Sequence, residues 1–396
     1  MREGMLADIQ KKYEETLKND VIPFWLKYSP DRKYGGYFTC LDRDGSVYGT
    51  DKQMWMQARA VWMFSRLYNE FEKKAEYLDF VRVGYEFIRK YGFDSDGRMF
   101  FLVTRDGKPL RKRRYLYTEN FGVIAFSEYY RATGDEEALS KAIDLYKLII
   151  KYYRTPGLLE PKIIPETRKL KTLAMPMILI ATSLEMMNVD SDPLYGEVID
   201  DSVYQIKNHF TKYELKVVLE NVGPHGEVYD IPDCRYINPG HSIEASWFLM
   251  KVALLKDDDN LLKVALDILD WSLESGWDRK YGGIYYFVDI KGKPLQQLEW
   301  DMKLWWPHTE AMYATLLAYC VTKDKKYLSW FDKINSWSFS HFPDPEFGEW
   351  FGYLHRDGSV SLKCKGAIWK GPFHLPRFLL FSIQEIERMK AHRVTL

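Results

Sequence analysis

Three histidines stand at the starts of helix-like segments at nearly equal spacing along the chain. His241 lies in "NPGHSIEASWF", His308 in "WWPHTEA" and His374 in "GPFHLPR", each close behind a Gly or Pro. The interval from the first to the second is almost the same as that from the second to the third. Imidazole is the side chain that both accepts and donates protons near neutral pH. The spacing therefore predicts acid–base chemistry at one level of a repeating structure.

The pair His241 and His374 suits the inversion of a carbon next to a carbonyl, which needs a base on one face and an acid on the other. His308, between them, is expected to polarise or bind an oxygen. Glu244, three residues after His241, is expected to orient that imidazole. The alternative is that the histidines only satisfy backbone groups at helix ends.

Charged residues also interrupt segments that are otherwise apolar. A buried charge is costly unless it is paired or used, so these residues are expected to belong to the same site. They are Arg59, Glu119, Glu244, Glu310 and Arg377, of which Glu119, Glu310 and Arg377 are expected to bind the substrate.

Other chemistries fit these residues less well. Three histidines could bind Zn²⁺, but no HxxxH or HxxE partner set accompanies them, so no metal is expected. Glu119, Glu244 and Glu310 could serve a glycosidase, which has no need of the histidines. The chain has neither a GxxxxGK[ST] phosphate loop nor a GxGxxG motif, which argues against an ATPase or a nicotinamide enzyme.

The composition of the 396 residues restricts the partners. The 56 Lys and Arg balance 56 Asp and Glu, so no overall field favours nucleic acid or a membrane surface. The four cysteines (40, 234, 320 and 364) form no CxxC motif, which favours reduced thiols in the cytoplasm. The N-terminus is charged and helix-like rather than a signal peptide. These features predict a soluble, cytoplasmic protein.

A hairpin-like motif recurs along the chain, as in "KYGGYFTCLDRDGSVY" and "EFGEWFGYLHRDGSV". Its turn glycines recur at nearly equal intervals, except that the second interval is about twice the others. The doubled interval indicates a degenerate copy around 161–170. Six units of about 60–66 residues then fill the chain. The turn glycines are Gly45, Gly107, Gly226, Gly292 and Gly358.

Each hairpin precedes an apolar helical segment and then a more charged one. Helices that are apolar nearly all round are buried, so the first set is predicted to form an inner ring. The pattern predicts an all-α protein, an (α/α)6 barrel with short β-hairpins on one rim, as a single domain over residues 1–396. An α-solenoid is the alternative, but no polar capping repeats are present. The inner segments are 52–70, 117–131, 172–187, 241–255, 306–320 and 372–389. The outer segments are 4–28, 74–91, 136–153, 195–211, 257–274 and 325–341.

Six stretches in this order resemble the N-acylglucosamine 2-epimerase family, also called renin-binding protein. They are "GGYFTCLDRDGSVY", "MWMQARAVWMF", "NPGHSIEASWFL", "LEWDMKLWWPHTEAMYA", "PEFGEWFGYLHRDG" and "KGPFHLPRFLL". The resemblance covers essentially the whole chain. It implies the same (α/α)6 barrel and the reversible interconversion of N-acetyl-D-glucosamine and N-acetyl-D-mannosamine.

The resemblance also implies roles for individual residues. His241 and His374 become the two acid–base residues, with Arg59 and Glu244 as catalytic partners and Arg377 as an essential polar partner. The implied steps are ring opening, removal of the C2 proton to an enediol or enediolate, turning of the C1–C2 unit, and reprotonation on the other face. Trp305 and Trp306 become pocket walls or sugar-stacking residues.

Related branches leave the substrate open. Cellobiose 2-epimerases and mannose-type aldose–ketose isomerases share the barrel and the histidine pair. His308 in "WWPHTEA" favours the acylhexosamine branch, while residues 161–171 resemble nothing that assigns a substrate. Some family members need ATP or another nucleotide as an activator, for which the sequence carries no motif. Long aromatic helices at a surface would suit an interface, so a homodimer is a further expectation. A protein that binds sugar or a partner without catalysis is the remaining alternative.

Overall fold

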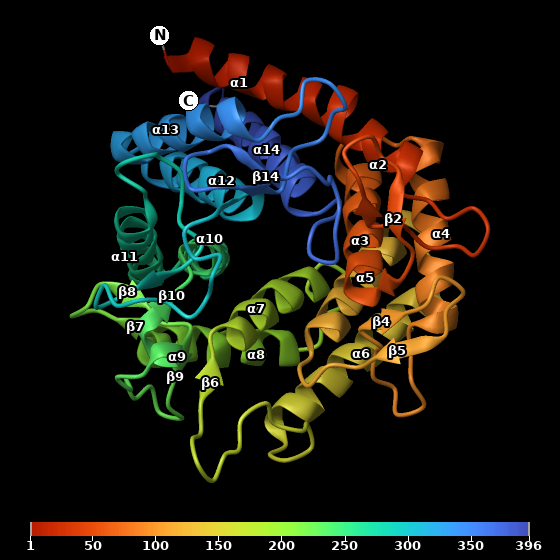
Figure 1. Ribbon diagram of the computed structural model, residues 1–396, viewed down its shortest axis with the longest axis horizontal. Helices are drawn as coiled ribbons and strands as arrows, with labels where there is room; N and C mark the ends of the chain where they lie inside the picture. Colours follow the sequence, from red (N-terminus) through yellow and green to blue (C-terminus); the bar gives the residue numbers. More distant parts are fainter. Residues whose placement is uncertain (1, 395–396) are drawn as a thin grey trace.

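The computed structural model describes residues 2–394 and shows two concentric rings of helices around a central axis (Figure 1). The inner ring agrees with the predicted segments to within a few residues, which confirms the (α/α)6 barrel. The inner helices are α3 (Met54–Glu70), α5 (Tyr117–Thr133), α7 (Ala174–Met186), α10 (Pro239–Lys256), α12 (Trp305–Thr322) and α14 (His374–Val394).

The outer ring packs one helix against each inner neighbour. The N-terminal helix packs against α14, so the start of the chain supplies the sixth outer position, as predicted. The outer helices are α1 (Arg2–Thr16) with the π-helical turn η1 (Leu17–Val21) and α2 (Ile22–Tyr28), α4 (Ala75–Tyr91), α6 (Glu136–Arg154), α8 (Leu194–Gln205) with the π-helical turn η2 (Ile206–Phe210), α11 (Asp259–Gly276) and α13 (Lys325–His341). The short helix α9 (Pro232–Arg235) precedes α10.

The inner and outer helices differ in how much of their surface is buried, because different neighbours surround them. Helix α12 is buried almost along its whole length, since outer helices, two inner neighbours and the cavity cover all its sides. Helices α4 and α6 have one buried face and one charged face, as expected of helices between a core and water. In the described part of the chain, no helix combines the length and apolarity that crossing a bilayer requires.

Short strands join neighbouring units at the rim where the inner helices begin. Residues just before α3, α7, α10 and α12 pair antiparallel with strands of a later unit, forming the pairs β3–β4, β6–β9, β10–β11 and β12–β13. The strands are β1 (Cys40–Leu41), β2 (Val47–Gly49), β3 (Lys52–Gln53), β4 (Leu102–Val103), β5 (Pro109–Arg111), β6 (Lys171–Thr172), β7 (Thr211–Lys212), β8 (Val217–Val218), β9 (Asn221–Val222), β10 (Tyr236–Ile237), β11 (Val288–Asp289), β12 (Lys303–Leu304), β13 (Tyr353–Leu354) and β14 (Val360–Leu362).

The predicted hairpins are confirmed in three units and wrong in two. Gly45, Gly107 and Gly358 each sit in the turn of a paired hairpin, with φ of 85°, 92° and 90°. Gly226 and Gly292 also have positive φ, but the strands before them pair with residues ahead of an inner helix. A glycine turn fixes the local backbone and does not choose the partner strand. Residues 161–170, the predicted degenerate copy, form bends and a turn without a strand.

Three salt-bridge clusters repeat the same residue types around this rim. In each, a buried aspartate binds a buried lysine of its own unit and the arginine of the next hairpin. The third cluster joins the last unit to the first and so closes the ring. The clusters are Asp31 with Lys52 and Arg105, Asp278 with Lys303 and Arg356, and Asp344 with Lys365 and Arg43.

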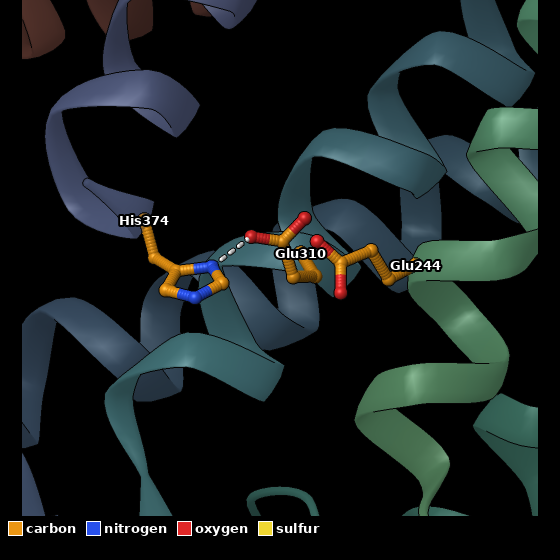
Figure 2. A group of neighbouring side chains, drawn as sticks. All are labelled: Glu244, Glu310 and His374. Carbon is orange, nitrogen blue, oxygen red and sulfur yellow. Dashed lines mark hydrogen bonds and ion pairs between the residues drawn. The ribbon is translucent and has the colours of Figure 1, made fainter. Parts of the chain in front are cut away.

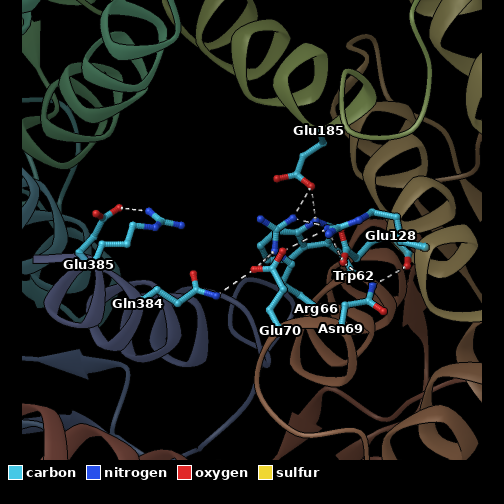
Figure 3. A network of polar contacts seen from close by, with 10 residues as sticks. Trp62, Arg66, Asn69, Glu70, Glu128, Glu185, Gln384 and Glu385 are labelled. Carbon is cyan, nitrogen blue, oxygen red and sulfur yellow. Dashed lines mark hydrogen bonds and ion pairs between the residues drawn. The ribbon is translucent and has the colours of Figure 1, made fainter. Parts of the chain in front are cut away.

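A second polar network ties the inner helices together at the opposite end of the barrel (Figure 3). Arg66 of α3 contacts Glu128 of α5 at 3.1 Å and Glu185 of α7 at 3.0 Å. Gln384 of α14 donates to Glu70 of α3 at 3.0 Å. Because α3 and α14 come from the two ends of the chain, this network closes the ring a second time.

The cluster that joins the first and last units predicts a large effect for Asp344→Asn. Burial raises the pKa of Asp344, but Arg43 and Lys365 outweigh burial and hold it below its ordinary value. The substitution leaves the buried Lys365 without its counterion, so the free energy of unfolding at pH 7, measured by urea titration, should fall by about 3–5 kcal/mol. The wild-type advantage should disappear as the pH falls through the lowered pKa of Asp344.

Glu346→Gln is the matched control, because Glu346 is an exposed partner of the same Arg43. Its effect should stay under about 1 kcal/mol, as is usual for surface ion pairs. Equal losses for the two variants would show that the buried cluster does not stabilise ring closure.

Candidate active site

A cavity of about 1020 Å³ runs along the axis of the barrel. Its walls come from the inner helices, the hairpin rim and the segment before α14, and they are mostly aromatic and apolar. A few charged side chains interrupt this wall at the end where the inner helices begin. They include Arg59, His241, Glu244, His374 and Arg377.

His241 is fixed by contacts that differ from those predicted. The Asn238 side chain caps α10 by accepting from the His241 backbone N–H at 3.2 Å. The imidazole Nδ1 lies 3.0 and 3.1 Å from the two carboxylate oxygens of Glu220. The expectation that Glu244 orients this ring is wrong, because that carboxylate pairs with Arg377 at 2.8 Å. Sequence reasoning missed Glu220, which precedes α10 in the chain and lies outside any helix.

His374 is oriented by the carboxylate of Glu310, as Figure 2 shows. The distance from Nδ1 to the Glu310 oxygen is 2.7 Å. The same oxygen accepts from Arg377 at 2.6 Å, and the other oxygen accepts from Trp247 at 2.9 Å. Glu310 is buried and lies behind the histidine, so it supports His374 rather than binding substrate as predicted.

The two imidazoles therefore experience opposite fields. Burial lowers the pKa of His241, but the Glu220 carboxylate outweighs it and raises the pKa above its ordinary value. Burial lowers the pKa of His374 well below its ordinary value, and the cations Arg377 and Arg59 lower it further. His241 is thus biased toward the imidazolium form, whereas His374 is neutral near neutral pH.

Arg377 occupies the centre of the acidic cluster. Oxygens of Glu244 and Glu310 and a nitrogen of His374 lie within 4.8 Å of one another, a grouping that could also hold a metal ion. The Arg377 guanidinium already donates to both carboxylates, at 2.8 and 2.6 Å. Arg377 is thus the cation that balances these buried charges.

Two tryptophans form a wall of the cavity, as predicted. Trp305 and Trp306 are both buried and both line it. The Trp306 ring lies 5.1 Å from the His241 ring and 5.7 Å from the His374 ring, centroid to centroid. Because α12 packs between α10 and α14, Trp306 stands between the two histidines. A ring-sized substrate against this indole would have an imidazole on each side.

Arg59 is a buried cation that faces the cavity with unused hydrogen-bonding capacity. Its side chain lies among the rings of Trp55, Phe121 and Phe373, at 5.0, 4.1 and 4.7 Å from their centroids. Among the described residues its Nε has no hydrogen-bond partner, and no carboxylate lies within ion-pair distance. Burial lowers its pKa to about 10, so the guanidinium remains charged at neutral pH.

His308 does not join the site. It is fully buried, its Nδ1 donates to the Leu304 carbonyl at 2.6 Å, and its Nε2 accepts from the Ile284 N–H at 2.9 Å. Burial lowers its pKa to about 3, so it stays neutral. The predicted equivalence fails by one residue, because His241 precedes Glu244 by three positions and His308 precedes Glu310 by two. One residue turns a side chain by about 100° around a helix, here away from the cavity.

Glu119 also lies outside the cavity. Its carboxylate accepts from Arg98 Nε at 2.8 Å and from the Met99 backbone N–H at 3.1 Å. The expectation that Glu119 binds substrate is therefore wrong, and the residue instead anchors the strand region before α5. A buried acid in an apolar helix does not by itself reveal which way it points.

The sequence profile described as N-acylglucosamine 2-epimerase (GlcNAc 2-epimerase) matches residues 36–374. A mouse protein named N-acylglucosamine 2-epimerase is 40% identical over 394 residues, which cover 97% of this chain and 93% of the mouse protein. The chain belongs to the N-acylglucosamine 2-epimerase family. It is accordingly an enzyme of the isomerase class.

More distant relatives share the barrel. A cellobiose 2-epimerase from Dictyoglomus turgidum is 27% identical over 96% of this chain and 100% of its own. The solved structure of cellobiose 2-epimerase from Bacillus thermoamylovorans has a TM-score of 0.85 and 26% identity, covering 96% of this chain and 99% of that one. The barrel of this epimerase-family chain thus agrees with an experimentally solved fold.

Since His308 is structural in this epimerase-family chain, we expect His308→Asn to affect folding rather than chemistry. The shorter amide cannot reach both Leu304 and Ile284, and a buried backbone group left unpaired costs about 1–3 kcal/mol. The melting temperature should fall, while kcat of the folded protein stays within about threefold of wild type.

His374→Asn is the comparison variant and should lose turnover with little change in melting temperature. A large loss of kcat in a well-folded His308→Asn variant would return His308 to the active site.

Proposed function

We propose that this enzyme inverts C2 of an N-acylhexosamine and interconverts N-acetyl-D-glucosamine and N-acetyl-D-mannosamine. The observation that carries the proposal is the pair of imidazoles on either side of Trp306, each with its Nδ1 against a carboxylate. The pKa of His241 is raised and that of His374 is lowered, which suits one to donate a proton and the other to accept one. Inversion at a carbon next to a carbonyl needs a proton acceptor and a proton donor together.

The reaction begins with the open-chain aldehyde of the sugar. Neutral His374 accepts the C2 proton at Nε2, because its Nδ1–H is engaged by Glu310. The electron pair moves to the C1 oxygen and gives an enolate, since nitrogen replaces the 2-hydroxyl of an ordinary aldose. His241 then donates its Nε2 proton to the opposite face of C2. With a base on each side, the C1–C2 unit does not have to turn.

Arg59 is suited to the enolate oxygen. Its guanidinium has no carboxylate partner within ion-pair distance among the described residues, so its charge is available to a developing negative charge. Fixed cations in a water-poor cavity stabilise such charge strongly because they need no reorganisation. Glu244 and Arg377 neutralise each other and can hydrogen-bond the sugar hydroxyls from the cavity wall.

The substrate assignment rests on the relatives. Proteins named N-acylglucosamine 2-epimerase are 38–40% identical to this chain, whereas proteins named cellobiose 2-epimerase are 24–27% identical. A cellobiose or mannose substrate is the second candidate, favoured by a cavity of about 1020 Å³, which exceeds the needs of one monosaccharide.

We further propose catalysis without a resident cofactor or metal, because Arg377 already provides the cation that the carboxylates require. A nucleotide such as ATP as activator is proposed from the family resemblance, and a homodimer is proposed from the aromatic helices of the sequence. A cytoplasmic location is proposed from the four cysteines, which are all free.

The substrate proposal predicts that purified enzyme converts N-acetylglucosamine and N-acetylmannosamine into each other. In heavy water, the product should carry deuterium at C2 from the first turnover, because the incoming proton comes from an exchangeable imidazole. Chromatography and mass spectrometry measure both, with and without ATP in the assay.

Cellobiose and mannose complete the substrate panel. Turnover of these sugars alone, or fructose as the main product from mannose, would replace the proposed substrate. A chelator should leave activity intact, and loss of activity restored by Zn²⁺ would contradict the metal-free proposal.

Arg59→Ala should lower kcat by on the order of 10²–10³-fold, the usual cost of removing one donor to an oxyanion. KM should change less, since the charge is used most in the transition state. Steady-state kinetics on both epimers measures the effect, and Arg59→Lys, which keeps a cation, should recover part of kcat. Wild-type kcat with only a raised KM would make Arg59 a ground-state contact.

A further inference from the structure

Glu220 belongs to none of the inner helices, yet its side chain reaches an active-site histidine. It lies on the short connection between β8 and β9. Its backbone carbonyl accepts from the Leu173 N–H at 2.9 Å, and the Leu219 N–H donates to the Phe210 carbonyl at 3.0 Å. Glu220 itself is only 7% exposed. The carboxylate is therefore held in place by structure that is separate from α10.

Glu220 contacts Nδ1 of His241 and leaves the other imidazole nitrogen free for proton transfer. Both Glu220 oxygens lie within hydrogen-bond distance of Nδ1, at 3.0 and 3.1 Å. With Nδ1–H donated to Glu220, Nε2 is the nitrogen left for the substrate. The ring also packs against Trp306, which fixes its plane.

Glu220 differs from the carboxylate that supports His374. Glu310 shares its charge with Arg377, so the cation cancels much of its effect on the imidazole. In the described part of the chain, Glu220 forms an ion pair with no lysine or arginine and pairs only with His241. No paired cation of the described chain therefore offsets the effect of its negative charge on the His241 imidazole.

The remaining charged groups around His241 do not replace Glu220. Glu244 on the same helix has a smaller effect, and His374 of α14 is neutral at neutral pH. Three tyrosines lie close enough to Glu220 to interact with its charge. Burial raises the pKa of each hydroxyl, so all three stay uncharged. They are Tyr117, Tyr236 and Tyr286.

We propose that Glu220 is the positioning residue that keeps a proton on His241, so that His241 is the proton donor and His374 the proton acceptor of the resting enzyme. This inference rests on the proposed function. After one inversion, His374 carries the proton taken from C2 and His241 is neutral. Water in the cavity must return one proton from His374 to His241 before the next turnover.

The test measures the pKa of His241 directly. In enzyme labelled with ¹³C at the imidazole Cε1, an NMR titration follows the eight histidines, and His241→Asn and His374→Asn assign two of the signals. Glu220→Gln should lower the pKa of His241 by about 1–3 pH units, the usual effect of removing an opposite charge at this distance. The His374 signal should not move.

The same change should appear in kinetics. The alkaline limb of the kcat/KM profile reports loss of the His241 proton in the free enzyme, so Glu220→Gln should move that limb to lower pH. The kcat should fall at least tenfold, since an amide also permits the wrong tautomer. Glu220→Asp keeps the carboxylate and should restore most of the pKa and of the alkaline limb.

Glu227→Gln is the control, because Glu227 lies exposed a few residues further along the same segment and does not line the cavity. It should match wild type in both measurements. An unchanged His241 pKa in Glu220→Gln, or equal behaviour of Glu220→Gln and Glu220→Asp, would overturn the proposal. The titration needs no substrate, so failure to turn over acylhexosamines would overturn the proposed function alone.

Discussion

The site depends on the guanidinium of Arg377, which lies between the carboxylates of Glu244 and Glu310 in a largely aromatic cavity. Buried charges of this kind are stable only when they are paired. Because Arg377 takes both carboxylates, Glu244 is not free for His241, and His374 remains neutral beside a cation. The other histidine then needs a carboxylate from elsewhere, which is Glu220.

The repeat explains how these residues come together. Glu244, Glu310 and Arg377 recur at the interval of the repeat and occupy equivalent positions on three consecutive inner helices. Inner helices of a barrel present equivalent positions to the same level of the axis. The two carboxylates and the guanidinium at these positions therefore converge, although two full repeats separate Glu244 from Arg377.

Ring closure is the structural condition for this convergence. The first and last inner helices, α3 and α14, make few direct contacts with each other. At one end of the barrel, Arg43 and Asp344 join the first and last units. At the other end, Glu70 of α3 and Gln384 of α14 join the two helices directly. The rim strands add backbone hydrogen bonds between units. His374 and Arg377 on α14 thus reach the positions that Arg59 on α3 and Glu244 on α10 require.

The sequence alone determined the helices, the sixfold repeat and, apart from Glu220, the charged residues that meet around His241 and His374. Apolar periodicity and Gly or Pro at helix starts are local properties, so α10 and α14 and the histidines at their first turns could be predicted. The tertiary structure alone decided which side chains meet. His308 lies outside the site because its position on α12 is shifted by one residue relative to that of His241 on α10. Glu119 lies outside it because its carboxylate pairs with Arg98. Glu220 is placed beside His241 by the pairing of β6 with β9. These segments are far apart in the chain, and no local pattern encodes their contact.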